Sequence, residues 1–175
     1  MARSVPLETP LAVALKGAAA GALGTLVLTL AMQNVHHFLG DRDEDDAEAS
    51  VSLSVAPAGD PTERLVEKVA AGVFEKELSP DARQTLGLGI HWGYGTFWGV
   101  AHGLIQSSLP LPGWLHGTFL GLAVWLIGPM GLVPAMKLSA RRVGRPTGAR
   151  FLSVFLHLLY GWATAAAFNL LSRES

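Results

Sequence analysis

Long stretches without a charged residue alternate along this chain with short segments rich in charge. No Asp, Glu, Lys or Arg occurs in the 53 residues from Gln84 to Met136, the 22 from Phe151 to Ser172, or the 19 from Gly17 to Val35. A membrane span needs about 20 apolar residues, because each residue of a helix rises by about 1.5 Å. The longest stretch therefore has room for two spans and a turn, and each of the others has room for one span.

These lengths predict an all-α protein, a single integral membrane bundle of four transmembrane helices. The expected spans are about 11–33, 84–107, 114–136 and 150–172. In the third span, Pro129 and Pro134 stand among glycines and predict a kink or break, because Pro removes a backbone hydrogen bond. Such a break lines a cavity in some transporters and is only a packing kink in other membrane helices.

The charged segment between the first two spans predicts two elements outside the bilayer. The acidic run at 41–60 is expected to be a solvated, disordered loop because its like charges repel; the alternative is a divalent-cation site, although it lacks the spacing of a calcium loop. At 61–78, apolar residues recur at helical spacing among charged ones, which predicts an amphipathic helix on the membrane surface or bundle mouth. Asp60 and Ser79 are suitable N-caps, and each precedes a Pro.

The thirteen Lys and Arg residues are unequally divided between the two faces of the expected bundle. Four spans place both termini and the 108–113 turn on a face with three of them, and the other connections on a face with ten. Because Lys and Arg remain cytoplasmic, we expect both termini outside and the amphipathic helix inside. A cleaved signal peptide is the alternative for the first apolar segment, but no small-residue cleavage site follows it.

Composition agrees with a membrane protein and limits its chemistry. Hydrophobic residues make up 50% and charged residues 15% of the chain, whereas soluble domains are about a quarter charged. The net charge of −1 gives no reason to expect a nucleic-acid partner. The chain has no Cys, which excludes disulfides, thiolate catalysis and iron–sulfur clusters. The last three spans contain no Asp or Glu, so acid–base work there would fall to histidine, and we expect a non-enzymatic protein.

Glycine recurs at every fourth position in the first two spans. The residues concerned are Gly17 and Gly21 in the first span and Gly95, Gly99 and Gly103 in the second. Small residues at this spacing let two helices approach closely, and packing of this kind drives helix association in lipid. We therefore predict that these faces pack on each other, or on a membrane-protein partner or a second copy of the chain.

Four histidines lie within the expected spans and are candidate ligands, because ionisable residues inside a membrane are costly to place there. Depth counted from the helix ends pairs His91 with His157 and His102 with His116. Two such pairs are typical of a membrane cytochrome in which imidazoles ligate two haems. The alternative is that each histidine is hydrogen-bonded within the bundle, and on that alternative no cofactor is predicted.

Aromatic residues of the last three spans suit either a pocket or the membrane interface, where Trp and Tyr are enriched. They are Trp92, Tyr94, Trp98, Trp114, Tyr160 and Trp162. Packing and interface placement is the interpretation that we favour, since no catalytic constellation accompanies them.

Three segments, HWGYGTFWGVAHG, GWLHGTFLGLAVWLIGPMGLVPAM and FLSVFLHLLYGW, occur in this order and resemble the YagU-like family of small bacterial inner-membrane proteins. The resemblance covers about Lys16 to Leu171, and the acidic stretch 41–59 is specific to this chain. It implies the same four-span fold and location. The family has no established activity or catalytic residues, so the resemblance assigns no site.

Three functional hypotheses follow from the sequence. The first is a non-enzymatic membrane protein that acts through helix packing with partners or with the bilayer. The second is a small transporter or channel component with a polar cavity at the broken third span. The third is a haem-binding redox protein that uses the intramembrane histidines.

Overall fold

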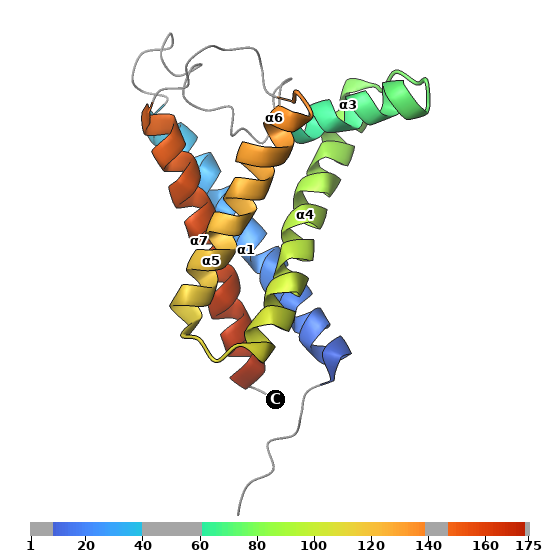
Figure 1. Ribbon diagram of the computed structural model, residues 1–175. Coiled ribbons are helices and arrows are strands. Elements are labelled where there is room, and N and C mark those ends of the chain that lie inside the picture. The colour runs from blue at the N-terminus through green and yellow to red at the C-terminus, as the bar shows by residue number, and fades with distance from the viewer. Residues whose placement is uncertain (1–8, 40–60, 139–146, 174–175) are drawn as a thin grey trace, which may run out of the picture.

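The computed structural model describes residues 9–39, 61–138 and 147–173, and all the regular elements in these ranges are helical, as predicted. In chain order they are α1 (Pro10–Leu39), α3 (Pro61–Val73), α4 (Pro80–Ser108), α5 (Gly113–Ile127), the π-helix η1 (Gly128–Leu132), α6 (Val133–Ala135) and α7 (Thr147–Arg173) (Figure 1). The acidic run 41–60 and the predicted cap Asp60 lie outside the described residues.

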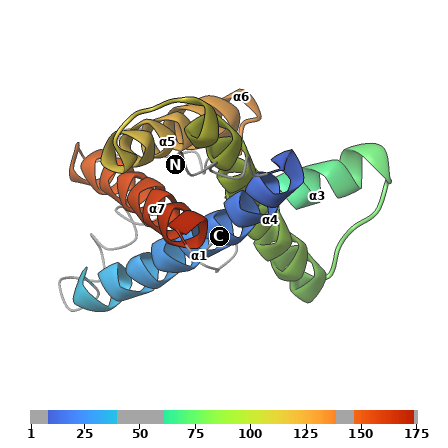
Figure 2. The ribbon, with the colours of Figure 1, turned by 90° about the horizontal axis from the view of Figure 1, so that it is seen from below.

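The long helices form a bundle in which successive helices run in opposite directions (Figures 1 and 2). α1 packs against α4 on one side and α7 on the other, and α5 packs against α7. α4 and α5 make few direct contacts with each other, although the short turn after Ser108 joins them. α3 crosses the start of α4 and projects sideways from one end of the bundle (Figure 1).

Three of the described helical segments are long and apolar enough to cross a membrane: Pro10–Val35, Gly113–Ala135 and Arg150–Arg173. They correspond to the first, third and fourth expected spans. α4, the second expected span, is not among them, although it is 29 residues long. Its many glycines, together with histidine, tyrosine and glutamine, lower its average hydropathy.

The ends of the helices follow local capping chemistry. α4 begins as predicted: the Ser79 hydroxyl accepts the N–H of Ala82 at 3.3 Å, and Pro80 takes the first helical position. The amphipathic helix α3 ends at Val73 and not at 78 as expected. The reason is that Glu75 adopts a left-handed φ of 52°, which turns the N–H of Lys76 back onto the carbonyl of Ala70.

The interruption predicted in the third span is a π-turn. Pro129 and Pro134 have no N–H to donate, so the regular ladder is incomplete there. The N–H of Val133 donates to the carbonyl of Gly128, five residues back, and the helix continues through η1 into α6. The helix is therefore widened by one residue in this turn and does not break.

The closest contact in the bundle joins the backbones of α1 and α4. A Cβ atom placed on Gly21 would lie 2.6 Å from the carbonyl oxygen of Gly95, and one on Gly17 would lie 2.6 Å from that of Gly99. One on Gly103 would lie 2.8 Å from the Phe168 ring and 3.2 Å from the Gly17 Cα. The structure thus places the two glycine faces against each other, and the missing side chains allow the two backbones to touch.

A second contact of the same kind joins α5 and α7. A Cβ atom on Gly121 would lie 2.5 Å from the carbonyl oxygen of His157, and Gly117 and Gly161 meet face to face one turn away. These glycines are not among the predicted packing residues, although Gly117 and Gly121 have the same four-residue step. These two glycine contacts lie on either side of the α1–α7 pair, in which Gly24 of α1 lies against Tyr160 and Thr164 of α7.

We expect Gly99→Ala to destabilise the protein, because the added methyl group would meet the α1 backbone at Gly17 and Gly21. Overpacking of this kind costs about 1–3 kcal/mol. Gly93→Ala is the matched control, since a Cβ there meets no atom within 4 Å. Thermal unfolding in detergent should show a lower midpoint for Gly99→Ala only, and equal midpoints for the two variants would contradict the contact.

Candidate functional site

Polar side chains line one side of α4 inside the bundle. Next to its glycine stripe, four residues repeat at steps of four: Tyr94, Trp98, His102 and Gln106. This polar stripe faces α5 and α7. The ring of His102 lies 5.9 Å from that of His116 on α5 and 6.0 Å from that of Phe168 on α7, and the Gln106 amide donates to Asn169 on α7.

The histidines predicted for the outer level do lie together. His102 and His116 are buried, with 3% and 4% of their surfaces exposed. The Nε2 of His116 lies 3.1 Å from the carbonyl oxygen of Leu109, and because a carbonyl can only accept, this nitrogen carries a proton and donates. Haem ligation through this nitrogen would therefore require His116 to lose its bond to the turn between α4 and α5.

The histidines predicted for the inner level also approach each other. His157 is buried, and its Nδ1 donates to the carbonyl of Ser153 at 2.7 Å. His91 on α4 lies within electrostatic reach of His157, and its Nε2 is 3.5 Å from the hydroxyl of Thr29 on α1. Among the described residues no group of three His, Asp or Glu side chains is arranged to hold a metal ion.

Several buried polar atoms in the interior lack a hydrogen-bond partner of good geometry among the described residues. They include the Tyr94 hydroxyl, Trp98 Nε1, His102 Nε2, Gln106 Oε1 and Thr164 Oγ1. Trp98 lies near Tyr94, and Gln106 near His102, without completing such a bond. An unpaired buried polar atom costs about 1–3 kcal/mol, and native proteins contain few of them. The polar stripe of α4 carries four of these atoms, and it is therefore a candidate site.

Tyr94, the first residue of the polar stripe, lies next to the π-helix η1. A Cβ atom on Gly128 would lie 3.1 Å from the Tyr94 hydroxyl oxygen, so the hydroxyl group lies against the first residue of η1. π-turns are frequent at functional sites because they change the backbone ladder locally. The irregular helix was predicted from the sequence, but the position of the Tyr94 side chain against it was not.

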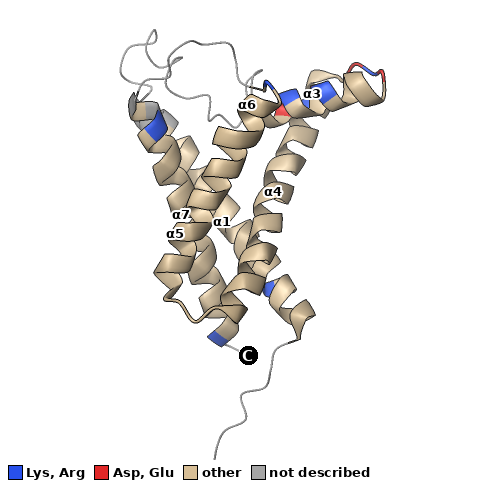
Figure 3. Cartoon of the chain, viewed as in Figure 1, with Lys and Arg blue, Asp and Glu red and all other residues tan. Residues whose placement is uncertain are grey.

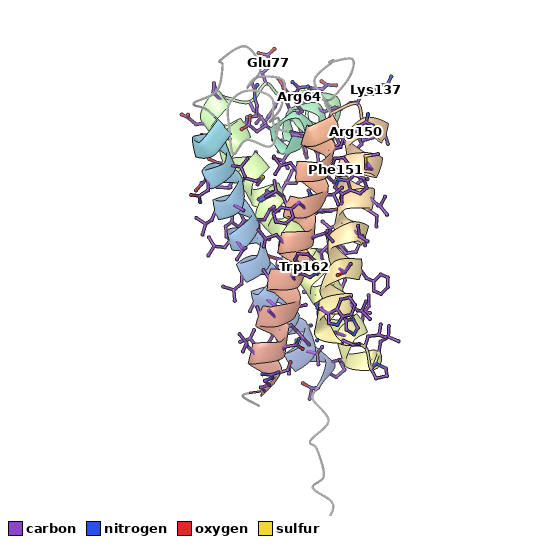
Figure 4. The ribbon with its side chains drawn as sticks, turned by 90° about the vertical axis from the view of Figure 1, so that its left-hand side faces the viewer. Arg64, Glu77, Lys137, Arg150, Phe151 and Trp162 are labelled. Carbon is purple, nitrogen blue, oxygen red and sulfur yellow. The ribbon has the colours of Figure 1, made fainter. Side chains whose placement is uncertain are left out.

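At the α3 end of the bundle, a carboxyl group is buried over the start of α4. Glu63 is 7% exposed, and a Cβ atom on Gly87 would lie 2.9 Å from its Cγ. The Lys68 ammonium donates to the carbonyl of Met136 at 2.7 Å and the Arg64 guanidinium to that of Leu138 at 3.4 Å, which fastens α3 to the end of α6. Figure 4 shows that Arg64, Lys137 and Arg150 lie at this same end of the bundle.

At the opposite end, a shallow hollow of about 400 Å³ lies between the start of α5 and the last turns of α7. Its lining residues are Gly113, Trp114, Trp162, Ala165, Ala166 and Asn169. Asn169 receives the bond from Gln106, so the hollow adjoins the end of the polar stripe. Trp114 and Trp162 are exposed here, which fits the predicted interface position for Trp114 better than a pocket in the core.

Comparison with family models, with curated proteins and with solved structures finds no match to this chain. Function is therefore inferred from the geometry. The buried Glu63 is the site residue that could be foreseen least from the sequence, because it stands near the start of the expected amphipathic helix, where charged residues are usually exposed. Glu63 precedes Gly87 by 24 residues in the sequence, and nothing in that separation indicates contact until α3 is seen to cross α4.

Tyr160→Phe tests whether the interior polar bonds support the bundle. The Tyr160 hydroxyl on α7 donates to the Gly95 carbonyl on α4 at 2.6 Å, and both groups are buried. Removing one hydroxyl should lower the free energy of unfolding by about 1 kcal/mol, since the ring remains and only the bond is lost. An unchanged unfolding midpoint in detergent would show that this bond does not hold α7 to α4.

Proposed function

We propose that the chain is an integral membrane protein of four spans, in which α4 crosses the membrane as well as the three helices that are apolar enough by composition. The observation that carries this proposal is the apolar surface of α4, which exposes Leu86, Leu88, Phe97, Leu104 and Ile105. The other three long helices also expose large apolar side chains, such as Leu23, Phe119 and Phe155. An exposed apolar surface on all four long helices supports contact with lipid, and Tyr94, His102 and Gln106, which lower the hydropathy of α4, lie on its inward-facing polar stripe.

The charges support an orientation for this bundle. The described basic residues lie at its two ends (Figure 3). Six belong to the end that carries α3, and two, Lys16 and Arg173, belong to the other; the six are Arg64, Lys68, Lys76, Arg83, Lys137 and Arg150. Because positive residues remain cytoplasmic, we propose that α3 lies inside and both termini outside, in a bacterial inner membrane. The resemblance to the YagU-like family supports the same location.

Single cysteines test whether α4 crosses the membrane, because the chain has no Cys of its own. Ser79→Cys and Ser108→Cys mark the two ends of α4. In intact cells, a membrane-impermeant maleimide should label Ser108→Cys and should reach Ser79→Cys only after the membrane is opened. Phe97→Cys, in the apolar face, should resist the reagent throughout. Labelling of both end positions from one side would show that α4 does not cross.

We further propose a non-enzymatic role for this protein. The glycine faces that first suggested partner helices are occupied within the bundle, but Gly89 and Gly93 on α4 face open space. α3 also exposes Val69, Val73 and Phe74 beside the bilayer-facing surface. These features support contact with lipid, with a partner helix or with a second copy of the chain.

A transport role is the second candidate, and the π-turn with Tyr94 against it is the observation that favours it. The buried polar atoms of the α4 stripe continue from this turn toward the outer end of the bundle. A haem role has less support, because the His116 nitrogen is already bonded to Leu109.

A further inference from the structure

We propose that the hollow between the start of α5 and the last turns of α7 binds one phospholipid of the outer leaflet, with an acyl chain in the hollow and the phosphate group at Arg173. The proposal rests on the four-span arrangement, which places this end of the bundle at the outer surface of the bilayer. It goes beyond general contact with lipid because it gives one lipid molecule a defined site.

The walls of the hollow are mostly apolar. Its volume of about 400 Å³ is within the range of small-ligand sites, which is about 300–1,000 Å³. Two of its lining side chains, Trp114 and Trp162, are 66% and 40% exposed, so the hollow opens to the outside of the bundle. The Trp162 indole N–H donates to the Thr118 hydroxyl at 3.0 Å, which fixes this ring in place. Ala165 and Ala166 also line the hollow, and their small side chains leave room for a hydrocarbon chain.

The face of α7 that borders the hollow matches one leaflet of a bilayer in length. Along this face, residues follow one another at steps of three or four and so lie on one side of the helix: Trp162, Ala166, Asn169 and Arg173. Trp162 lies partway along α7 (Figure 4), and Arg173 is the last residue of that helix. From the first to the second the helix rises by about 16 Å, and one leaflet is about 15 Å of a hydrocarbon core of about 30 Å.

The Asn169 side chain presents a hydrogen-bond donor to the hollow. Its oxygen already accepts a hydrogen bond from the Gln106 amide. A Cβ atom placed on Gly113 would meet the Asn169 side-chain nitrogen, and Gly113 itself lines the hollow, so the NH₂ group lies on the side of the hollow. An ester carbonyl oxygen accepts a hydrogen bond from such a group. In a phospholipid the ester groups lie between the acyl chains and the phosphate, which is the order of Ala166, Asn169 and Arg173 along α7.

Arg173 supplies a positive charge at the outer end of this face. It is exposed and follows Asn169 by four residues. Because the side chains of a helix lean toward its N-terminus, the Arg173 side chain lies over the turn that carries Asn169. A guanidinium group binds phosphate oxygens through two parallel N–H groups. The described residues of α5 and α7 include no Asp or Glu, so these two helices bring no carboxylate that would repel the phosphate.

Native mass spectrometry of the full-length protein in detergent tests this site. The protein is titrated with phosphatidylglycerol, or with diacylglycerol, which has the same chains but no phosphate. The wild type should bind one phosphatidylglycerol and should bind diacylglycerol more weakly. Arg173→Gln should weaken the binding of phosphatidylglycerol by about tenfold, because a charge-assisted hydrogen bond is lost. Arg150→Gln is the matched control, since it removes the same exposed charge from the other end of α7.

A second pair of variants tests the hollow itself. Ala166→Phe should also weaken the binding of phosphatidylglycerol, because the added ring would occupy the space that the acyl chain needs. Leu170→Phe is its control, since this side chain is 60% exposed on the same helix and does not line the hollow.

Three outcomes would overturn the lipid site. The first is equal binding of phosphatidylglycerol and diacylglycerol, and the second is wild-type binding by both Arg173→Gln and Ala166→Phe. The third is a dimer of the chain that Ala166→Phe abolishes, because a second copy would then occupy the hollow. Maleimide labelling of Ser79→Cys and Ser108→Cys separates the two proposals: labelling from opposite sides without selective lipid binding refutes the lipid site alone, and labelling from one side refutes the four-span arrangement.

Discussion

The rest of the structure depends on the backbone contact between α1 and α4. Because Gly17 and Gly21 meet Gly95 and Gly99 without side chains between them, α4 lies closer to α1 than any larger residue would permit. This contact also fixes the rotation of α4 about its axis. The residues just before each glycine, at 94, 98 and 102, are thereby turned toward α5 and α7, and the apolar residues at 97, 104 and 105 face outward.

That rotation has an energetic consequence. It buries the polar stripe in an interior where hydrogen-bond partners are scarce, and each unpaired atom opposes folding by about 1–3 kcal/mol. The glycine contacts, the Tyr160 bond to Gly95 and the apolar cluster around Leu156 stabilise the bundle against this cost. A bundle selected only for stability would place leucine at these positions, so the polar stripe is best understood through what it could bind or transfer.

Much of the fold could be predicted because depth along a helix follows directly from counting residues at about 1.5 Å each. The common level of His102 and His116, the start of α4 at Ser79 and the irregular third span all follow from such local rules. The burial of Glu63, the close contact of Gly121 with α7 and the position of Tyr94 at Gly128 could not be predicted. They depend on how each helix is rotated and which neighbour it meets, and a single sequence carries little information on either. The amphipathic helix was predicted too long because nothing in EKEL signals the left-handed residue Glu75.

The central claim is that α4 crosses the bilayer with its polar stripe inward, and nitroxide scanning along this helix tests it most directly. Single cysteines from 93 to 108 would carry a spin label in vesicles, and collisions with oxygen and with a water-soluble nickel complex would be measured at each. We predict oxygen collisions that peak at the outward positions Phe97, Leu104 and Ile105 and fall at 94, 98 and 102, with nickel collisions rising only near Ser108. High nickel collisions at Phe97, with no periodic change along the helix, would contradict the account.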